Sequence, residues 1–154
     1  MNFQKKHFKL IMYFWILVII LSVLVYYIKE NLEIEKLNTI ETNLLLVQAK
    51  INNIKVNSQV NNSNLLVGKN VTEYENSNFI NELIDKHIIS QDESYKYYVF
   101  DKNTLYEIEL GDAILENNEY ILVNYETGEI LLSKPFIYKK NEYYKLSEIK
   151  QIER

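Results

Sequence analysis

The sequence predicts an α+β protein, with a long N-terminal helix that crosses a membrane and a small antiparallel β-sheet domain after it. Residues 10–28 form an almost uninterrupted apolar run, and residues 37–54 carry apolar side chains at helical spacing. The tyrosine-rich C-terminal half alternates between strand-like runs and turns. No glycine precedes Gly68 and the only proline is Pro135, so nothing breaks a helix before the asparagine-rich residues 57–64.

Residues 10–28 are long and apolar enough to span a bilayer. At ~1.5 Å per residue they form a helix of about 28 Å, close to the ~30 Å of hydrocarbon that a span must match. A cleaved secretory signal is the alternative interpretation. Such a signal has a shorter apolar region and ends in small residues, whereas Lys29, Glu30 and Asn31 follow this run. We therefore expect a retained transmembrane helix at 10–28.

Lysines before the span predict its orientation. Lys5, Lys6 and Lys9 lie on its N-terminal side, and short lysine-rich segments stay in the cytoplasm. We expect residues 1–9 to be a cytoplasmic tail and the chain from residue 29 onward to lie outside the cell.

Composition narrows the function classes. The formal net charge is −4, and the part after the lysine-rich tail is more acidic still, unlike that of a nucleic-acid-binding protein. The chain has 0 cysteines, which excludes disulfides and thiolate metal sites. The outer domain must therefore be held together by packing alone.

An apolar stripe continues the helix beyond the membrane. Its spacings of three and four residues draw one helical face, here called the seam. The seam consists of Leu37, Ile40, Leu44, Val47, Ile51 and Ile54. We expect residues 29–56 to extend the helix and to pack the seam against the chain's own sheet, because Leu45 and Leu46 widen the stripe. A short coiled coil with another chain is the alternative.

Residues 57–64 are predicted to be a polar linker, because asparagine and serine favour turns. The outer α+β domain is predicted to span residues 65–154. A short helix capped by Ser77 or Asn78 should bury Phe79, Ile80, Leu83 and Ile84. Tyr97–Phe100 is strand-like. Residues 103–107 offer a helix cap that is followed three residues later by an acid, and Gly111 should close this short helix.

Two hairpins complete the predicted sheet. Strands at 119–125 and 129–133 are joined through Thr127 and Gly128, whose glycine can adopt the left-handed conformation. A second hairpin is expected at 136–138 and 143–146, with residues 139–142 as its turn and Ser147 capping a last helical turn.

The N-terminal residues Lys5-Lys6-His7-Phe8-Lys9-Leu10-Ile11-Met12 pass from a basic stretch into an apolar helix. This segment resembles the N-terminal motif of type IV pilins and pseudopilins, particularly the pilin-like type II secretion system proteins of Gram-positive bacteria. Phe8, Leu10 and Ile11 match that motif. Residues 39–50 are similar to the family's long helix, and residues 120–130, with the Thr127-Gly128 turn, to its terminal hairpin.

Two residues depart from the family motif. His7 stands where the prepilin peptidase requires glycine, and Met12 stands where the family has a glutamate that pairs with the N-terminal amine of a neighbouring subunit. Without that glutamate the buried amine would lack a countercharge, which would destabilise a pilus core by several kcal/mol. We expect no processing, and a permanently anchored protein in place of a polymerising major subunit.

Groups suited to catalysis are sparse. The sequence has no glycine-rich phosphate loop and no serine nucleophile elbow. Asp85-Lys86-His87 and an acidic group read as solvated surface. The acidic group consists of Glu107, Glu109, Asp112 and Glu116.

The resemblance implies a non-enzymatic, pilin-like membrane protein, structural or accessory in a pilus or type II secretion-like assembly. Its expected partners are membrane lipid and other pilin-like or envelope proteins, contacted through the long helix. We expect no cofactor, no metal, no nucleic acid and no small-molecule substrate. The alternative is a bitopic envelope scaffold that recruits partners through a short coiled coil, as in divisomes.

Overall fold

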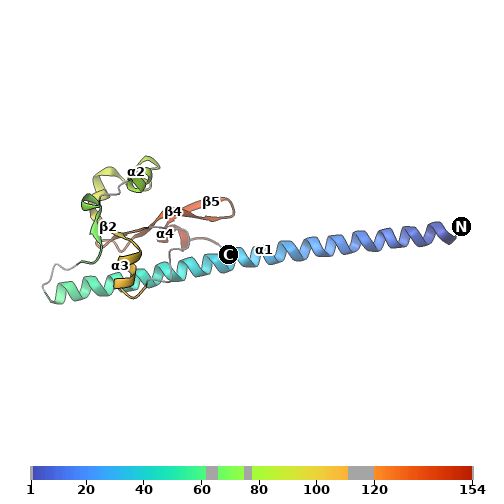
Figure 1. Cartoon of the computed structure of the whole chain (residues 1–154), viewed down its shortest axis with the longest axis horizontal. Coiled ribbons are helices and arrows are strands. Elements are labelled where there is room, and N and C mark those ends of the chain that lie inside the picture. The colour runs from blue at the N-terminus through green and yellow to red at the C-terminus, as the bar shows by residue number, and fades with distance from the viewer. Residues whose placement is uncertain (1, 62–65, 75–77, 111–119, 154) are drawn as a thin grey trace. The chain divides into compact units, whose positions relative to one another are not determined.

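The computed structural model describes residues 2–61, 66–74, 78–110 and 120–153, with side chains from His7 onward. The chain divides into two compact units, Met1–Lys36 and Leu37–Arg154. A long N-terminal apolar helix is followed by a small antiparallel sheet, which confirms the α+β class (Figure 1).

Helix α1 (Asn2–Val60) contains no glycine or proline that would interrupt it. It continues through Asn57–Val60, which the sequence had assigned to the polar linker. The Asn57 side chain donates to Asn53 Oδ1 one turn earlier (2.9 Å), and the Asn61 amide still bonds to the Asn57 carbonyl (3.0 Å). These contacts satisfy the polar groups within the helix, so asparagine does not end it at residue 57.

Five strands form one sheet in the order β1-β2-β3-β4-β5, and every neighbouring pair is antiparallel. Their bounds are β1 (Lys69–Asn70), β2 (Tyr97–Phe100), β3 (Ile121–Asn124), β4 (Ile130–Tyr138) and β5 (Asn141–Lys145). Strand β1 was not predicted, because a two-residue strand carries no alternating pattern.

Short helices connect the strands. They are η1 (Val71–Glu73), α2 (Asn78–Asp85), η2 (Gln91–Lys96), α3 (Lys102–Glu107) and α4 (Leu146–Ile149). Helix α2 buries Ile80 and Leu83, as expected. Asn78, one of the two proposed caps, is the first residue of α2, and Ser77 lies outside the described residues.

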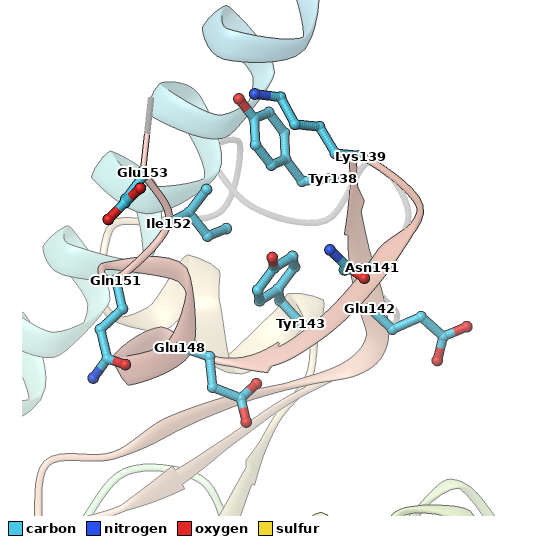
Figure 2. A pocket seen from close by; sticks show the side chains of 9 residues that line it. All are labelled: Tyr138, Lys139, Asn141, Glu142, Tyr143, Glu148, Gln151, Ile152 and Glu153. Carbon is cyan, nitrogen blue, oxygen red and sulfur yellow. The ribbon is translucent and has the colours of Figure 1, made fainter.

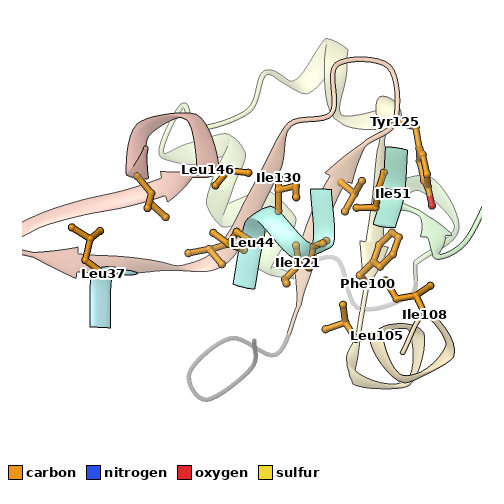
Figure 3. Packing of buried hydrophobic residues seen from close by; sticks show 14 of the residues in the cluster. Leu37, Leu44, Ile51, Phe100, Leu105, Ile108, Ile121, Tyr125, Ile130 and Leu146 are labelled. Atoms are coloured by element: carbon orange, nitrogen blue, oxygen red, sulfur yellow. The ribbon is translucent and has the colours of Figure 1, made fainter. Parts of the chain in front are cut away.

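Both faces of the sheet are covered. The second half of α1 packs with α3, α4 and the side chains of alternate sheet residues such as Ile121, Val123 and Ile130 (Figure 3). The intervening residues Leu122 and Leu131 point to the other face, where α2 packs. Strand β3 is therefore buried along its whole length, since successive side chains of a strand alternate between two covered faces.

The cap and the end of helix α3 differ from the prediction. Helix α3 is capped by Asp101, whose Oδ1 accepts from the Thr104 amide (2.9 Å), and so by a residue before the 103–107 segment in which the cap was predicted. It ends at Glu107, and Gly111 lies outside the described residues. Asp101 was missed because it directly follows the buried strand β2.

The second hairpin turns more tightly than predicted. Only Lys139 and Lys140 form the turn, both with positive φ (47° and 70°), while Asn141 and Glu142 already pair within β5. Its first strand, β4, runs through Pro135. The register of the pairing with β5 shifts between Leu131 and Phe136, so the missing N–H of Pro135 breaks no hydrogen bond of that ladder.

Helix α4 was also assigned the wrong cap. Glu148 Oε2 accepts from the amides of Tyr144 (3.0 Å) and Lys145 (3.1 Å), so the acid folds back on the helix start. The Ser147 hydroxyl instead donates to Glu129 Oε1 (3.0 Å).

Candidate functional site

The apolar part of α1 is the first candidate site. Within the described residues one helix near the N-terminus is long and apolar enough to cross a membrane, and its apolar window is entirely unburied. Ser22 is the one serine or threonine between Leu10 and Val25. Its hydroxyl donates to the Val18 carbonyl one turn earlier (2.8 Å). That bond satisfies the polar group inside the helix, as hydrocarbon requires.

The five residues of the degenerate prepilin motif lie on α1 between residues 7 and 12, with Lys9 among them. Phe8, Leu10, Ile11 and Met12 are all exposed, as is His7. The structure does not gather them into a site, because they lie on one straight stretch of helix. Met12 adds a further apolar side chain to the segment where the family has a carboxylate.

The seam lies in the other unit and is packed against the sheet. Leu37, Leu44 and Val47 are 0% exposed and Ile51 is 1% exposed. Ile40 and Ile54 are half-buried against the same cluster. The structure thus places all six seam residues in contact with the chain's own core. The expectation that Leu45 and Leu46 widen the seam was wrong, because these side chains are 37% and 48% exposed.

The turn of the first hairpin also lies against α1. Gly128 has φ +72°, and its amide donates to the Asn124 carbonyl (2.8 Å). Its own carbonyl accepts from Gln48 Nε2 (2.6 Å), and Lys55 Nζ lies 3.2 Å from the Glu126 carbonyl. The structure therefore brings the seam helix and the hairpin turn together.

Two residues of this contact were missed from the sequence. Asn124 Oδ1 accepts from the amides of Glu126 (2.9 Å) and Thr127 (3.2 Å), which shapes the turn. An asparagine directly before a predicted turn is a usable signal for this role. Gln48 had no such signal, because its partner is a backbone carbonyl far away in the sequence.

Tyr125 joins the first hairpin to the segment before β1. Its hydroxyl donates to the Val67 carbonyl (2.9 Å) and accepts from the Val67 amide (3.2 Å). Burial raises the pKa of Tyr125 to about 12, since a phenolate would lose its hydration there. The neutral hydroxyl is the form that can make both bonds.

Asp85, Lys86 and His87 do not form a catalytic group. Lys86 Nζ contacts Glu82 Oε1 (2.8 Å) and the Tyr144 hydroxyl (2.8 Å), which raises the pKa of Lys86. His87 takes a left-handed conformation (φ 57°) just beyond the end of α2 and is exposed. These residues end a helix and fasten it to β5.

The predicted acidic group is partly described. Glu109 pairs with Lys50 (Oε2 to Nζ, 3.1 Å), and Glu107 is exposed. Asp112 and Glu116 lie outside the described residues. Within the described part of the chain no cluster of three acidic or histidine side chains that could hold a metal occurs.

A depression of about 480 Å³ lies beside β5 and α4. Figure 2 shows the side chains of Tyr143 and Ile152 near its centre, with Glu148 at the side. The Glu148 carboxylate already accepts two backbone amides. The buried Tyr138 hydroxyl has no hydrogen-bond partner among the described residues.

No family model, no curated protein and no solved structure matches the chain.

Proposed function

We propose that this chain is a non-enzymatic, single-pass membrane protein of pilin-like build, a structural or accessory component of a type IV pilus or type II secretion-like assembly. One observation carries the proposal. Helix α1 supplies both an exposed apolar segment of span length and, farther along, the seam that one face of an antiparallel sheet covers.

Energetics support the membrane part. Most residues between Leu10 and Ile28 are leucine, isoleucine or valine. Their insertion contributes roughly −4 to −8 kcal/mol on the scale measured for helix insertion. An exposed apolar segment of this length in water would instead be a strong aggregation site.

Packing of the seam argues against a scaffold that recruits a partner through it. To free the seam, the sheet would have to release Leu37, Leu44 and Ile51. Exposing each of these side chains costs about 1.5–3 kcal/mol. The seam therefore serves the chain's own fold.

Two of the polar groups that were considered for catalysis make structural contacts. Lys86 is held by Glu82 and Tyr144, and Glu109 is held by Lys50. A non-enzymatic role is consistent with these contacts.

Topology is tested by labelling single cysteines, because the chain has 0 cysteines of its own. Ile137 is 64% exposed, so Ile137→Cys should react with a membrane-impermeant maleimide on intact cells. The matched variant His7→Cys should react only after the cells are permeabilised. Labelling of His7→Cys on intact cells, or release of the protein by carbonate, would refute the anchored topology.

The pilin-like role is tested by genetics. The gene should lie near genes for an assembly ATPase and a prepilin peptidase, and its deletion should reduce surface filaments or secretion. A locus without these genes, together with a division defect on deletion, would instead support the envelope scaffold.

A further inference from the structure

The outer face of α1 in the Leu37–Arg154 unit lacks charge. None of the exposed residues between Leu37 and Val60 is charged, although charged residues make up 25% of the chain. The outer face of a solvated helix ordinarily carries charged side chains. Depletion of charge is typical of the core of a protein interface.

Two of the three charged residues in this stretch of α1 reach residues outside the helix. Glu41, Lys50 and Lys55 are all half-buried. Lys50 pairs with Glu109 (3.1 Å), and Lys55 donates to the Glu126 carbonyl (3.2 Å). This stretch of α1 therefore does contain charged residues, but none of them lies on its exposed outer surface.

Exposed residues on this surface follow a coiled-coil repeat. We call them the open face: Thr42, Leu46, Ala49, Asn53, Val56 and Val60. Their spacings alternate between four and three residues, so Leu46, Asn53 and Val60 occupy one core position of a heptad and the others the second. At ~3.6 residues per turn, this stripe lies opposite the seam.

We propose that the open face docks against the same face of a second copy of this chain, forming a parallel, in-register pair. This proposal depends on the membrane anchoring proposed above. Two copies anchored by the same segment run in the same direction. Equivalent residues then lie at the same distance along the chain from the membrane.

Symmetry favours a second copy over a different partner. In a two-fold pair each open-face residue meets its own counterpart, so a charged residue would face a like charge. The open face has none. Asn53 would meet Asn53 of the second copy. Its Oδ1 already accepts from the Asn57 side chain (2.9 Å), but an amide oxygen can accept a second bond and the amide nitrogen can donate. A core asparagine paired in this way selects two strands and fixes their register.

The pair should be weak in solution. The open face covers less than three heptads, and Thr42 and Ala49 fill core positions poorly. An interface that is stable in solution generally buries about 1,200–2,000 Å². Anchoring in one membrane raises the effective concentration enough for a small interface to form.

Disulfide cross-linking of the full-length protein in membranes tests the pair. Asn53→Cys and Val56→Cys should each form a cross-linked dimer on mild oxidation. Gln59→Cys is the matched control, because it is exposed on the same helix but off the open face. Its dimer yield should be lower by about tenfold, since a cysteine off the interface meets its counterpart only by collision.

A second variant tests the interface without disturbing the fold. Asn53→Lys places like charges opposite each other and should reduce cross-linking of Val56→Cys by about tenfold. Asn53 is exposed, and the bond that it loses to Asn57 is exposed to solvent as well, so the thermal unfolding midpoint should fall by no more than a few degrees. A Val56→Cys yield unaffected by Asn53→Lys would refute the pair.

Two further outcomes separate the possible failures. Equal yields at all three cysteines in an anchored protein would overturn the pair and leave the proposed function standing. Stronger cross-linking between Thr42→Cys and Asn53→Cys copies than between identical copies would also overturn it, because it indicates a staggered stack. Release of the protein by carbonate would overturn the anchoring itself.

Discussion

Two glycines with positive φ should differ in what an added methyl group costs. At Gly128 (φ +72°) a new Cβ would lie 3.6 Å from Asn52 Oδ1 and 3.8 Å from Gln48 Nε2, which are ordinary contacts. The Gly128→Ala cost is therefore backbone strain alone, about 1–2 kcal/mol. At Gly68 (φ +89°) the Cβ would lie 2.9 Å from Phe100 Cε2 and 3.0 Å from the Val99 carbonyl oxygen.

The clash at Gly68 adds to the strain. Phe100 is fully buried, and the Val99 carbonyl belongs to the sheet backbone, so neither can move freely. Overpacking of this kind costs about 1–3 kcal/mol, which brings Gly68→Ala to about 2–5 kcal/mol. Gly128→Val should fall between the two alanine variants or near Gly68→Ala, because a β-branched side chain is poorly tolerated at positive φ.

Thermal unfolding of the full-length protein in detergent, followed by the near-UV circular dichroism of its tyrosines, measures both effects. For a domain of this size 1 kcal/mol shifts the midpoint by roughly 3–6 °C. Gly128→Ala should lower the midpoint by about 3–12 °C and Gly68→Ala by clearly more. A Gly68→Ala loss no larger than that of Gly128→Ala would refute the reasoning from the close contacts, and an unchanged midpoint for Gly128→Val would refute the turn geometry.

Four further outcomes are expected. Replacing the Lys139-Lys140 turn by Asn-Gly should stabilise the fold by about 1 kcal/mol in thermal unfolding, because both positions have positive φ. Tyr138→Phe should leave stability unchanged or raise it by up to about 1 kcal/mol, since it removes a buried hydroxyl without a partner. Alkaline titration of stability should show a loss as pH rises from about 10 to about 12, because unfolded Tyr125 releases its proton near 10 whereas folded Tyr125 holds it to about 12; Tyr125→Phe should reduce that slope. The intact mass of protein from membranes should correspond to a start at residue 1 or 2, and a species starting at Phe8 would show that His7 does not block cleavage.

Helical periodicity made the buried face of α1 predictable, and runs rich in β-formers made the central strands predictable, whereas η1 and η2 were not predicted. The seam spacing identified the buried side of α1, and Tyr97–Phe100 was predicted with the bounds that β2 has. The Gly128 turn was predictable because few residues other than glycine tolerate its φ. In each case the determining interactions are local in sequence.

Features that depend on distant partners were not predictable. Gln48 contacts a carbonyl 80 residues away, and Tyr125 holds Val67 across 58 residues. The cap of α4 was missed for a different reason. Glu148 reaches back to two amides at the helix start, so the neighbouring Ser147 only resembled a cap.

The placement of lysines on α1 links the fold to the proposed pair. Lysines on the outer face of the helix would favour solubility. The lysines of this stretch instead contact Glu109, through Lys50, and the turn at Glu126, through Lys55. Salt bridges between exposed groups contribute only about 0–1 kcal/mol, so folding alone gives little reason for this arrangement. Moving a lysine to the outer face, as in Asn53→Lys, would cost the fold little. In the proposed pair, Asn53→Lys places two like charges opposite each other and prevents association. The absence of charge on the open face is therefore explained by assembly and not by folding.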